Sequence, residues 1–141
     1  MKFKEILEMW KEDNQIDQTE IGDEIEKTYS LHCKYYDLLH TAKLTLKSYE
    51  YELKRKRVEA FEDYTQGPPK GSSRQPPAVG RILRADSGMY LDADEQLQEL
   101  SAKIDAEQLK VDFLKDVLDQ IKYRNNSLKS VLDWIKYTGG A

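Results

Sequence analysis

The chain has 141 residues, of which 34% are charged and 39% are hydrophobic, and its formal net charge is −4. No apolar run reaches the roughly 18 residues of a membrane span and no apolar segment follows Met1, so we expect neither a membrane protein nor a secreted one. The single cysteine, Cys33, excludes an intrachain disulfide and fits a reducing cytosol. The acidic balance argues against a generally basic nucleic-acid binder, so the distribution of charge matters more than its sum.

The spacing of Phe3, Ile6, Leu7 and Trp10 predicts a short amphipathic helix over residues 2–12, because these side chains share one helical face. A polar stretch follows directly and ends this element. The apolar face of so short a helix needs a partner surface. We favour packing on a neighbouring subunit over a docking arm for another protein.

Residues 18–65 are predicted to form one long helix, because apolar residues advance along them by three and four positions. The positions of this first seam are Ile21, Ile25, Thr28, His32, Tyr35, Leu39, Ala42, Leu46, Tyr49, Leu53, Lys56 and Ala60. The seam is mixed, since it includes polar residues. A second stripe, formed by Tyr29, Tyr36, Phe61 and Tyr64, widens the predicted buried face.

A mobile linker is predicted over residues 66–92, where the helical pattern stops. Its first half contains Gly67-Pro68-Pro69, Gly71-Ser72-Ser73 and Pro76-Pro77. These runs cannot continue a helix, because proline lacks a backbone N–H and glycine is entropically costly.

A second long helix is predicted over residues 93–137, and it carries the most regular pattern in the chain. Its seam consists of Leu97, Leu100, Ile104, Glu107, Val111, Leu114, Leu118, Ile121, Asn125, Leu128, Leu132 and Ile135, ten of which are aliphatic. A coiled-coil spacing of this length cannot be buried by one helix alone. Asn125 either fixes the register of a packed seam or faces water near a frayed end, and both interpretations stay open.

The predicted fold is all-α, with two long antiparallel helices in a helical hairpin and a short N-terminal helix. Pairing the two seams with each other leaves the tyrosine stripe and the N-terminal helix without a partner. We therefore expect the chain to form a homo-oligomer.

Basic residues are concentrated in one part of the chain. Residues 54–84 hold eight basic residues and three acids, whereas residues 86–108 hold one Lys and seven acids. The linker residues Lys70, Arg74, Arg81 and Arg84 are candidates for phosphate contacts, and a solubilising loop is the alternative. The run Lys54-Arg55-Lys56-Arg57 either binds phosphates or pairs with the acidic start of the second long helix. An oligomer would combine many such weak contacts through avidity.

Tyr64 and Tyr90 flank the linker and are candidates for stacking on nucleobases. No Gly-rich phosphate loop, nucleophile motif or Cys/His ligand pattern is present in the sequence, so we expect no enzyme, no cofactor and no metal site. His32, Cys33 and His40 cluster on one helical stretch, but they are interpreted as packed or solvated side chains.

Several stretches of the chain occur in an order typical of one protein family. They are Lys2-Phe3 with Leu7-Glu8, Lys11-Glu12-Asp13 and Ile16-Asp17-Gln18-Thr19; Leu31-His32-Cys33-Lys34-Tyr35; Asp63-Tyr64-Thr65-Gln66-Gly67; Leu83-Arg84-Ala85-Asp86; and Leu118-Asp119-Gln120-Ile121-Lys122-Tyr123-Arg124. In these stretches, nearly end to end, the chain resembles the UvsY family, the recombination mediators of large tailed, T-even-like bacteriophages. The order and spacing of these stretches agree with those of the family.

The resemblance implies a ring-shaped homo-oligomer, a heptamer, that binds single-stranded DNA and contacts the phage recombinase and the phage single-strand-binding protein. It implies a protein without catalytic activity that acts in the cytoplasm of the infected bacterial host. The family pattern has Lys-Ala-Arg just before the helix end, where this chain has Val58-Glu59-Ala60. We therefore carry DNA binding over to the region and prefer Lys54, Arg55 and Arg57, because Lys56 falls on the seam.

Two other functions stay open. A structural coiled-coil adaptor that joins two proteins would oligomerise without binding DNA. A regulator of double-stranded sites would need a short basic recognition helix, and no helix-turn-helix is recognisable in the sequence.

Overall fold

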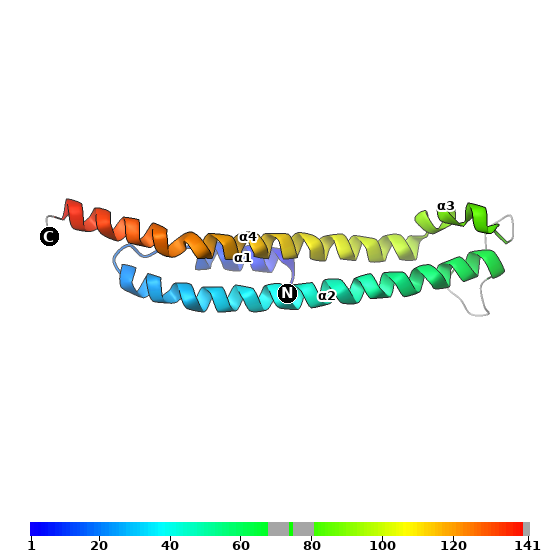
Figure 1. Ribbon diagram of the computed structural model, residues 1–141, viewed down its shortest axis with the longest axis horizontal. Helices are drawn as coiled ribbons and strands as arrows, with labels where there is room; N and C mark the ends of the chain where they lie inside the picture. The colour runs from blue at the N-terminus through cyan, green and yellow to red at the C-terminus, as the bar shows by residue number, and fades with distance from the viewer. Residues whose placement is uncertain (68–73, 75–80, 140–141) are drawn as a thin grey trace. The chain divides into compact units, whose positions relative to one another are not determined.

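The computed structural model describes residues 1–67, residue 74 and residues 81–139, and these residues form helices and turns with no β-strand among them. The helices are α1 (Phe3–Asp13), α2 (Ile21–Gln66), the 3-10 helix η1 (Arg84–Asp86), α3 (Ser87–Asp92) and α4 (Glu95–Thr138) (Figure 1). The all-α prediction is confirmed for this part of the chain. Predictions on residues 68–73 and 75–80, including Lys70, fall outside the described residues. None of the helices described has the length and apolarity that crossing a bilayer requires.

The chain divides into two compact units, and α2 and α4 contribute to both. Unit 1 consists of Met1–Lys43 and Leu109–Ala141, and unit 2 consists of Leu44–Gln108. Within each unit the segments of α2 and α4 run antiparallel, since later residues of α2 meet earlier residues of α4. The predicted hairpin pairing is therefore present in each unit.

In unit 1, aromatic side chains hold α1 against the two long helices. The ring of the buried Trp10 meets that of Tyr35 on α2 edge to face, with centroids 5.2 Å apart. At the other end of α1, the ring of Phe3 meets that of Phe113 on α4 in the same manner, also at 5.2 Å. Edge-to-face pairs of this kind add stabilisation beyond the apolar area that they bury.

A carboxylate fixes the end of α1 to the same surface of α2. The Asp13 carboxylate accepts hydrogen bonds from the Tyr35 hydroxyl, at 2.8 Å, and from the Lys34 ammonium, at 2.7 Å. Partial burial opposes ionisation of Asp13, but these two donors outweigh it and hold the pKa of the carboxyl below its usual value. Burial and the Asp13 carboxylate together raise the pKa of Tyr35.

A second charged contact in unit 1 joins α2 to α4. The buried Arg124 guanidinium pairs with the Glu24 carboxylate and donates from Nε to the Thr28 hydroxyl, at 3.3 Å. The sequence pattern did not predict Arg124 as an interior residue. Its neighbour Asn125 is half-buried with an Oδ1 atom that has no hydrogen-bond partner in the described structure.

Most of the predicted α4 seam faces the interior. Buried positions are Leu97, Leu100, Val111, Leu114, Ile121 and Leu128; half-buried positions are Ile104, Leu118 and Leu132; and Ile135 is exposed. Val117 is also buried. The interior stripe is therefore wider than a strict seam, as expected where a helix of 3.6 residues per turn drifts from a seven-residue repeat.

The second stripe on α2 differs from the prediction. Tyr29 and Tyr36 are 69% and 57% exposed in the single chain, so they do not widen its buried face. His32 is also exposed, and the adjacent Leu31 is buried in its place. The prediction that these two tyrosines are buried relied on their apolar rings alone and is wrong, because the hydroxyl of a tyrosine allows the side chain to lie in water.

The core of unit 2 explains why part of the predicted linker is helical. Leu91 is buried with Ala60 of α2 and Leu97 of α4, and the half-buried Phe61 and Tyr64 pack against these three residues. Burial of Leu91 stabilises α3, so the predicted linker over residues 66–92 is wrong for residues 87–92. A helix of six residues is too short to show a periodic pattern in the sequence.

Candidate nucleic-acid interface

The basic run of α2 is exposed in unit 2. Lys54, Arg55 and Arg57 project from the helix into solvent, and among the described residues none of them forms an ion pair. Lys56 is half-buried and pairs with Glu59 on its own helix, with 3.4 Å between Nζ and the carboxylate. Lys56 is thus less exposed than the other three basic residues, as its position on the seam predicted. Lys54, Arg55 and Arg57 form no ion pair with the acidic start of α4 among the described residues, although such pairing was the alternative interpretation of the basic run.

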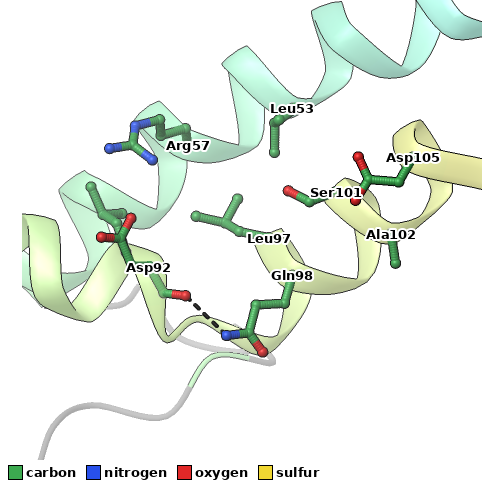
Figure 2. Close-up of a pocket in the computed structure, with 9 residues that line it drawn as sticks. Leu53, Arg57, Asp92, Leu97, Gln98, Ser101, Ala102 and Asp105 are labelled. Atoms are coloured by element: carbon green, nitrogen blue, oxygen red, sulfur yellow. Dashed lines mark hydrogen bonds between the residues drawn. The ribbon is translucent and has the colours of Figure 1, made fainter. Parts of the chain in front are cut away.

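Arg57 also borders an open pocket of about 310 Å³ between α2, α3 and α4. Figure 2 shows Leu97 pointing from α4 toward α2, where Leu53 and Arg57 lie, with Asp92 and Asp105 on either side of it. Asp92 and Asp105 line the same pocket as Arg57, and their negative charge reduces the attraction of this pocket for a phosphate. Lys54 and Arg55 do not line this pocket, so they are the stronger candidates for DNA contact.

Arg74 does not present its charge to solvent. Its guanidinium donates to the Asp63 carboxylate at 2.6 Å and to the Asp94 carboxylate at 2.7 Å, and the residue is 7% exposed. It also donates to Gln96 at 3.1 Å and lies 5.7 Å from the ring centroid of Tyr64. We call these five residues the Arg74 cluster. Because Asp63 is on α2 and Asp94 lies directly before α4, the cluster ties this position of the linker to the end of α2 and the start of α4.

The predicted role of Arg74 as a phosphate contact therefore does not fit its place in the structure. A buried guanidinium that already has two carboxylate partners would have to break both pairs to reach a phosphate. No acid lies between Lys70 and Arg84 in the sequence, but Asp63 and Asp94 lie outside this stretch, near the end of α2 and directly before α4.

Hydrogen bonds within the Arg74 cluster stabilise the ionised form of Asp94. Burial opposes ionisation of Asp94, but hydrogen bonds from Arg74, Tyr64 and the backbone N–H of Leu97 outweigh it, so the pKa of the carboxyl is below its usual value. The bond from Leu97, at 3.0 Å, also caps the first turn of α4. Burial and the hydrogen bond to Asp94 raise the pKa of Tyr64 to about 12.

Two other basic residues of the linker are exposed. Arg81 and Arg84 lie on either side of the buried Ile82, whose backbone N–H donates to the carbonyl of Tyr64 at 2.8 Å. This contact places both arginines near the end of α2 in unit 2. They remain candidate phosphate contacts.

The two candidate stacking residues contact each other. Tyr64 and Tyr90 have ring centroids 5.9 Å apart with a 45° angle between their planes, and both are half-buried. The hydroxyl of Tyr64 donates to Asp94 at 2.7 Å, so that side chain already has a structural role. Base stacking at this pair stays a prediction.

Within the described ranges, no three His, Cys, Asp or Glu side chains gather in a way that could hold a metal ion. His32 instead lies parallel to the ring of Tyr36, with centroids 6.1 Å apart, and Cys33 is exposed.

Comparisons with known proteins agree with this arrangement. A family model described as recombination, repair and ssDNA binding protein UvsY matches residues 9–141. A crystal structure of the bacteriophage T4 recombination mediator protein UvsY, lattice type IV, matches with a TM-score of 0.82 and 23% identity over 97% of this chain and 99% of that chain. The lattice type II structure of that protein gives a TM-score of 0.81 and 22% identity over 99% and 98%. No curated protein sequence matches significantly.

The structural matches show that the fold is shared, and the family match covers nearly the whole sequence. The predicted resemblance is therefore confirmed. This all-helical chain belongs to the UvsY family of recombination, repair and single-stranded DNA binding proteins.

Proposed function

We propose that this protein promotes loading of the phage recombinase onto single-stranded DNA that is covered by the phage single-strand-binding protein. The observation that carries the proposal is that Lys54, Arg55 and Arg57 are exposed in unit 2 of an otherwise acidic chain and form no ion pair among the described residues. Family membership supplies the ligand class, and these cations supply a surface that attracts phosphates.

The proposed assembly is a ring-shaped homo-oligomer, a heptamer by resemblance. Each subunit contributes a few basic residues, and a single strand that crosses many subunits would bind through the sum of weak contacts. Such binding depends on the backbone and tolerates any sequence. We propose that the wrapped strand is held in a form that the recombinase can bind while the single-strand-binding protein is displaced.

DNA binding is tested by fluorescence anisotropy of a labelled single strand and its duplex at several salt concentrations. The variant Lys54→Ser/Arg55→Ser/Arg57→Ser is expected to bind the single strand more weakly. Its salt slope should fall by about two, since each phosphate contact in a single strand contributes about 0.7. Equal binding of duplex and single strand, or no binding at low salt, would refute the proposal, and the second result favours the coiled-coil adaptor.

A matched control removes the same charge from another helix. Lys115, Lys122 and Lys129 are exposed on α4 in unit 1, and Lys115→Ser/Lys122→Ser/Lys129→Ser deletes three cations without touching the proposed surface. An equal loss of affinity in this variant would mean that overall charge, and not the α2 run, determines binding.

Arg81→Ser/Arg84→Ser tests the linker separately. If both arginines contact phosphates, the salt slope falls by about 1.4 while the thermal midpoint stays near that of the parent. An unchanged slope would assign DNA binding to α2 alone.

Mediator activity is measured as recombinase ATP hydrolysis on single strands that are saturated with the single-strand-binding protein. The parent protein should shorten the lag, and the triple α2 variant should not. Native mass spectrometry of the same samples tests the subunit number.

A further inference from the structure

One exposed aromatic residue of α2, which has no role in the interface described above, lies one turn before the basic run Lys54-Arg55-Lys56-Arg57. Tyr51 belongs to unit 2 and is 55% exposed. On a helix, the surface neighbours of a residue are those three and four positions away, with Cβ atoms about 5–6 Å apart. For Tyr51 these neighbours are Lys47, Ser48, Lys54 and Arg55. Three of the four are cationic and none is acidic.

The contact between the ring and one cation is already formed. The ammonium of Lys54 lies 5.9 Å from the centroid of the Tyr51 ring. Lys47, on the other side, pairs with Glu50 at 3.6 Å on an exposed part of the helix, a contact that is weak in water. Tyr51 thus presents its ring to solvent with positive charge along both directions of the helix.

The other exposed aromatic residues of the described helices lack this setting. Phe3, Tyr29, Tyr36, Tyr123, Trp134 and Tyr137 have no Lys or Arg three or four positions away in the sequence. Exposed tyrosines are therefore common on this chain, but only the basic segment of α2 surrounds one with cations within the described part.

The charge of this face determines what can cover it. Two copies of the same face would repel each other through Lys47, Lys54 and Arg55. A single-stranded nucleic acid complements both features, because its phosphates pair with the cations and an unpaired base stacks on the ring. A duplex keeps its bases stacked on one another and offers only phosphates.

The geometry points to Tyr51 as a base-stacking residue for single-stranded DNA, with Lys47, Lys54 and Arg55 holding the adjoining phosphates. This inference rests on the proposed function, since it requires that the protein bind a single strand. It adds the basis on which the protein distinguishes single strands from duplex, which the cations alone do not provide.

The test compares two oligonucleotides of equal length, oligo(dT) and an abasic strand with the same phosphates. Tyr51→Ala is expected to weaken binding of oligo(dT) about tenfold, within the range of a stacked base. Binding of the abasic strand and both salt slopes should be unchanged, because no charge is removed. Tyr36→Ala, which replaces a tyrosine of similar exposure on the same helix, is the matched control and should bind both strands like the parent.

A second measurement does not depend on affinity. In Tyr51→Trp, the added indole fluorescence is expected to be quenched by oligo(dT) and not by the abasic strand, relative to the same titrations of the parent. Quenching by both strands, or by neither, would overturn the stacking role.

The remaining outcomes separate the two proposals. If the parent binds oligo(dT) and Tyr51→Ala binds it equally well, the stacking inference is wrong and the proposed function stands. If the parent binds neither strand at low salt, both are wrong. If Tyr51→Ala changes the subunit number in native mass spectrometry, the ring belongs to a subunit contact, and the inference is overturned.

Discussion

Replacing Arg74 with methionine removes a buried cation and leaves two carboxylates without their partner. The side chains of Asp63 and Asp94 are 8% and 3% exposed, so water cannot readily replace the guanidinium. Removing one member of a buried ion pair typically costs about 3–5 kcal/mol, because the remaining charge stays desolvated. Methionine retains most of the side-chain volume, so the loss reports on charge and not on a cavity.

The loss can be followed as a thermal midpoint. For a chain of this length, 3–5 kcal/mol corresponds to a decrease of about 10–15 °C at neutral pH. Because the folded protein holds the pKa of Asp94 below its usual value, the stabilisation from this carboxylate is present above about pH 4 and is lost as pH falls through the lower folded value. The difference between Arg74→Met and the parent should therefore shrink below about pH 4.

Differential scanning calorimetry from pH 3 to pH 7 measures both effects. Arg84→Met is the control, since Arg84 is exposed and such substitutions usually change stability by less than about 0.5 kcal/mol. If Arg74→Met unfolds at the same temperature as the parent but loses salt-dependent DNA affinity, then Arg74 acts on phosphates and its structural role is refuted.

Two further predictions concern α4 and the glycines. Arg124→Met should destabilise unit 1 by about 3 kcal/mol in chemical denaturation, because the half-buried Glu24 loses its cation; an unchanged transition midpoint would contradict this. Gly67→Ala should destabilise by about 1 kcal/mol because Gly67 has a φ of +92°, whereas Gly88→Ala within α3 should stabilise by a similar amount. Among the described residues, neither added methyl meets another atom within 4 Å. Equal effects at both positions would show that backbone conformation is not the cause.

The long helices could be predicted from the sequence because each repeats one pattern over many turns. The expected ranges 18–65 and 93–137 correspond to α2 at Ile21–Gln66 and α4 at Glu95–Thr138. Proline and glycine mark the intervening boundary strongly. α3 could not be predicted in this way, because its stability comes from tertiary burial of Leu91 and not from a repeated local signal.

Only part of the candidate site could be predicted from the sequence, because some of its basic residues are exposed whereas one forms buried ion pairs. Lys54, Arg55 and Arg57 lie off the seam, so their exposure follows from helical periodicity alone. The burial of Arg74 depends on Asp63 and Asp94, which are 11 and 20 residues away, and no local pattern pairs them. Helical periodicity predicts which face of a helix a side chain occupies. An ion pair between residues distant in the sequence can be recognised only once the fold is known.

The sequence separation of the contacts in the two units has a consequence for folding order. In unit 2, the contacts of Arg74 and Tyr64 join residues 11 to 30 positions apart, whereas Arg124 of unit 1 meets Glu24 across 100 positions. Closing the longer loop costs about 1 kcal/mol more in chain entropy, so we expect the hairpin of unit 2 to nucleate folding. Stopped-flow measurements should then show that Arg74→Met slows refolding and that Arg124→Met accelerates unfolding, and the reverse assignment would place the nucleus in unit 1.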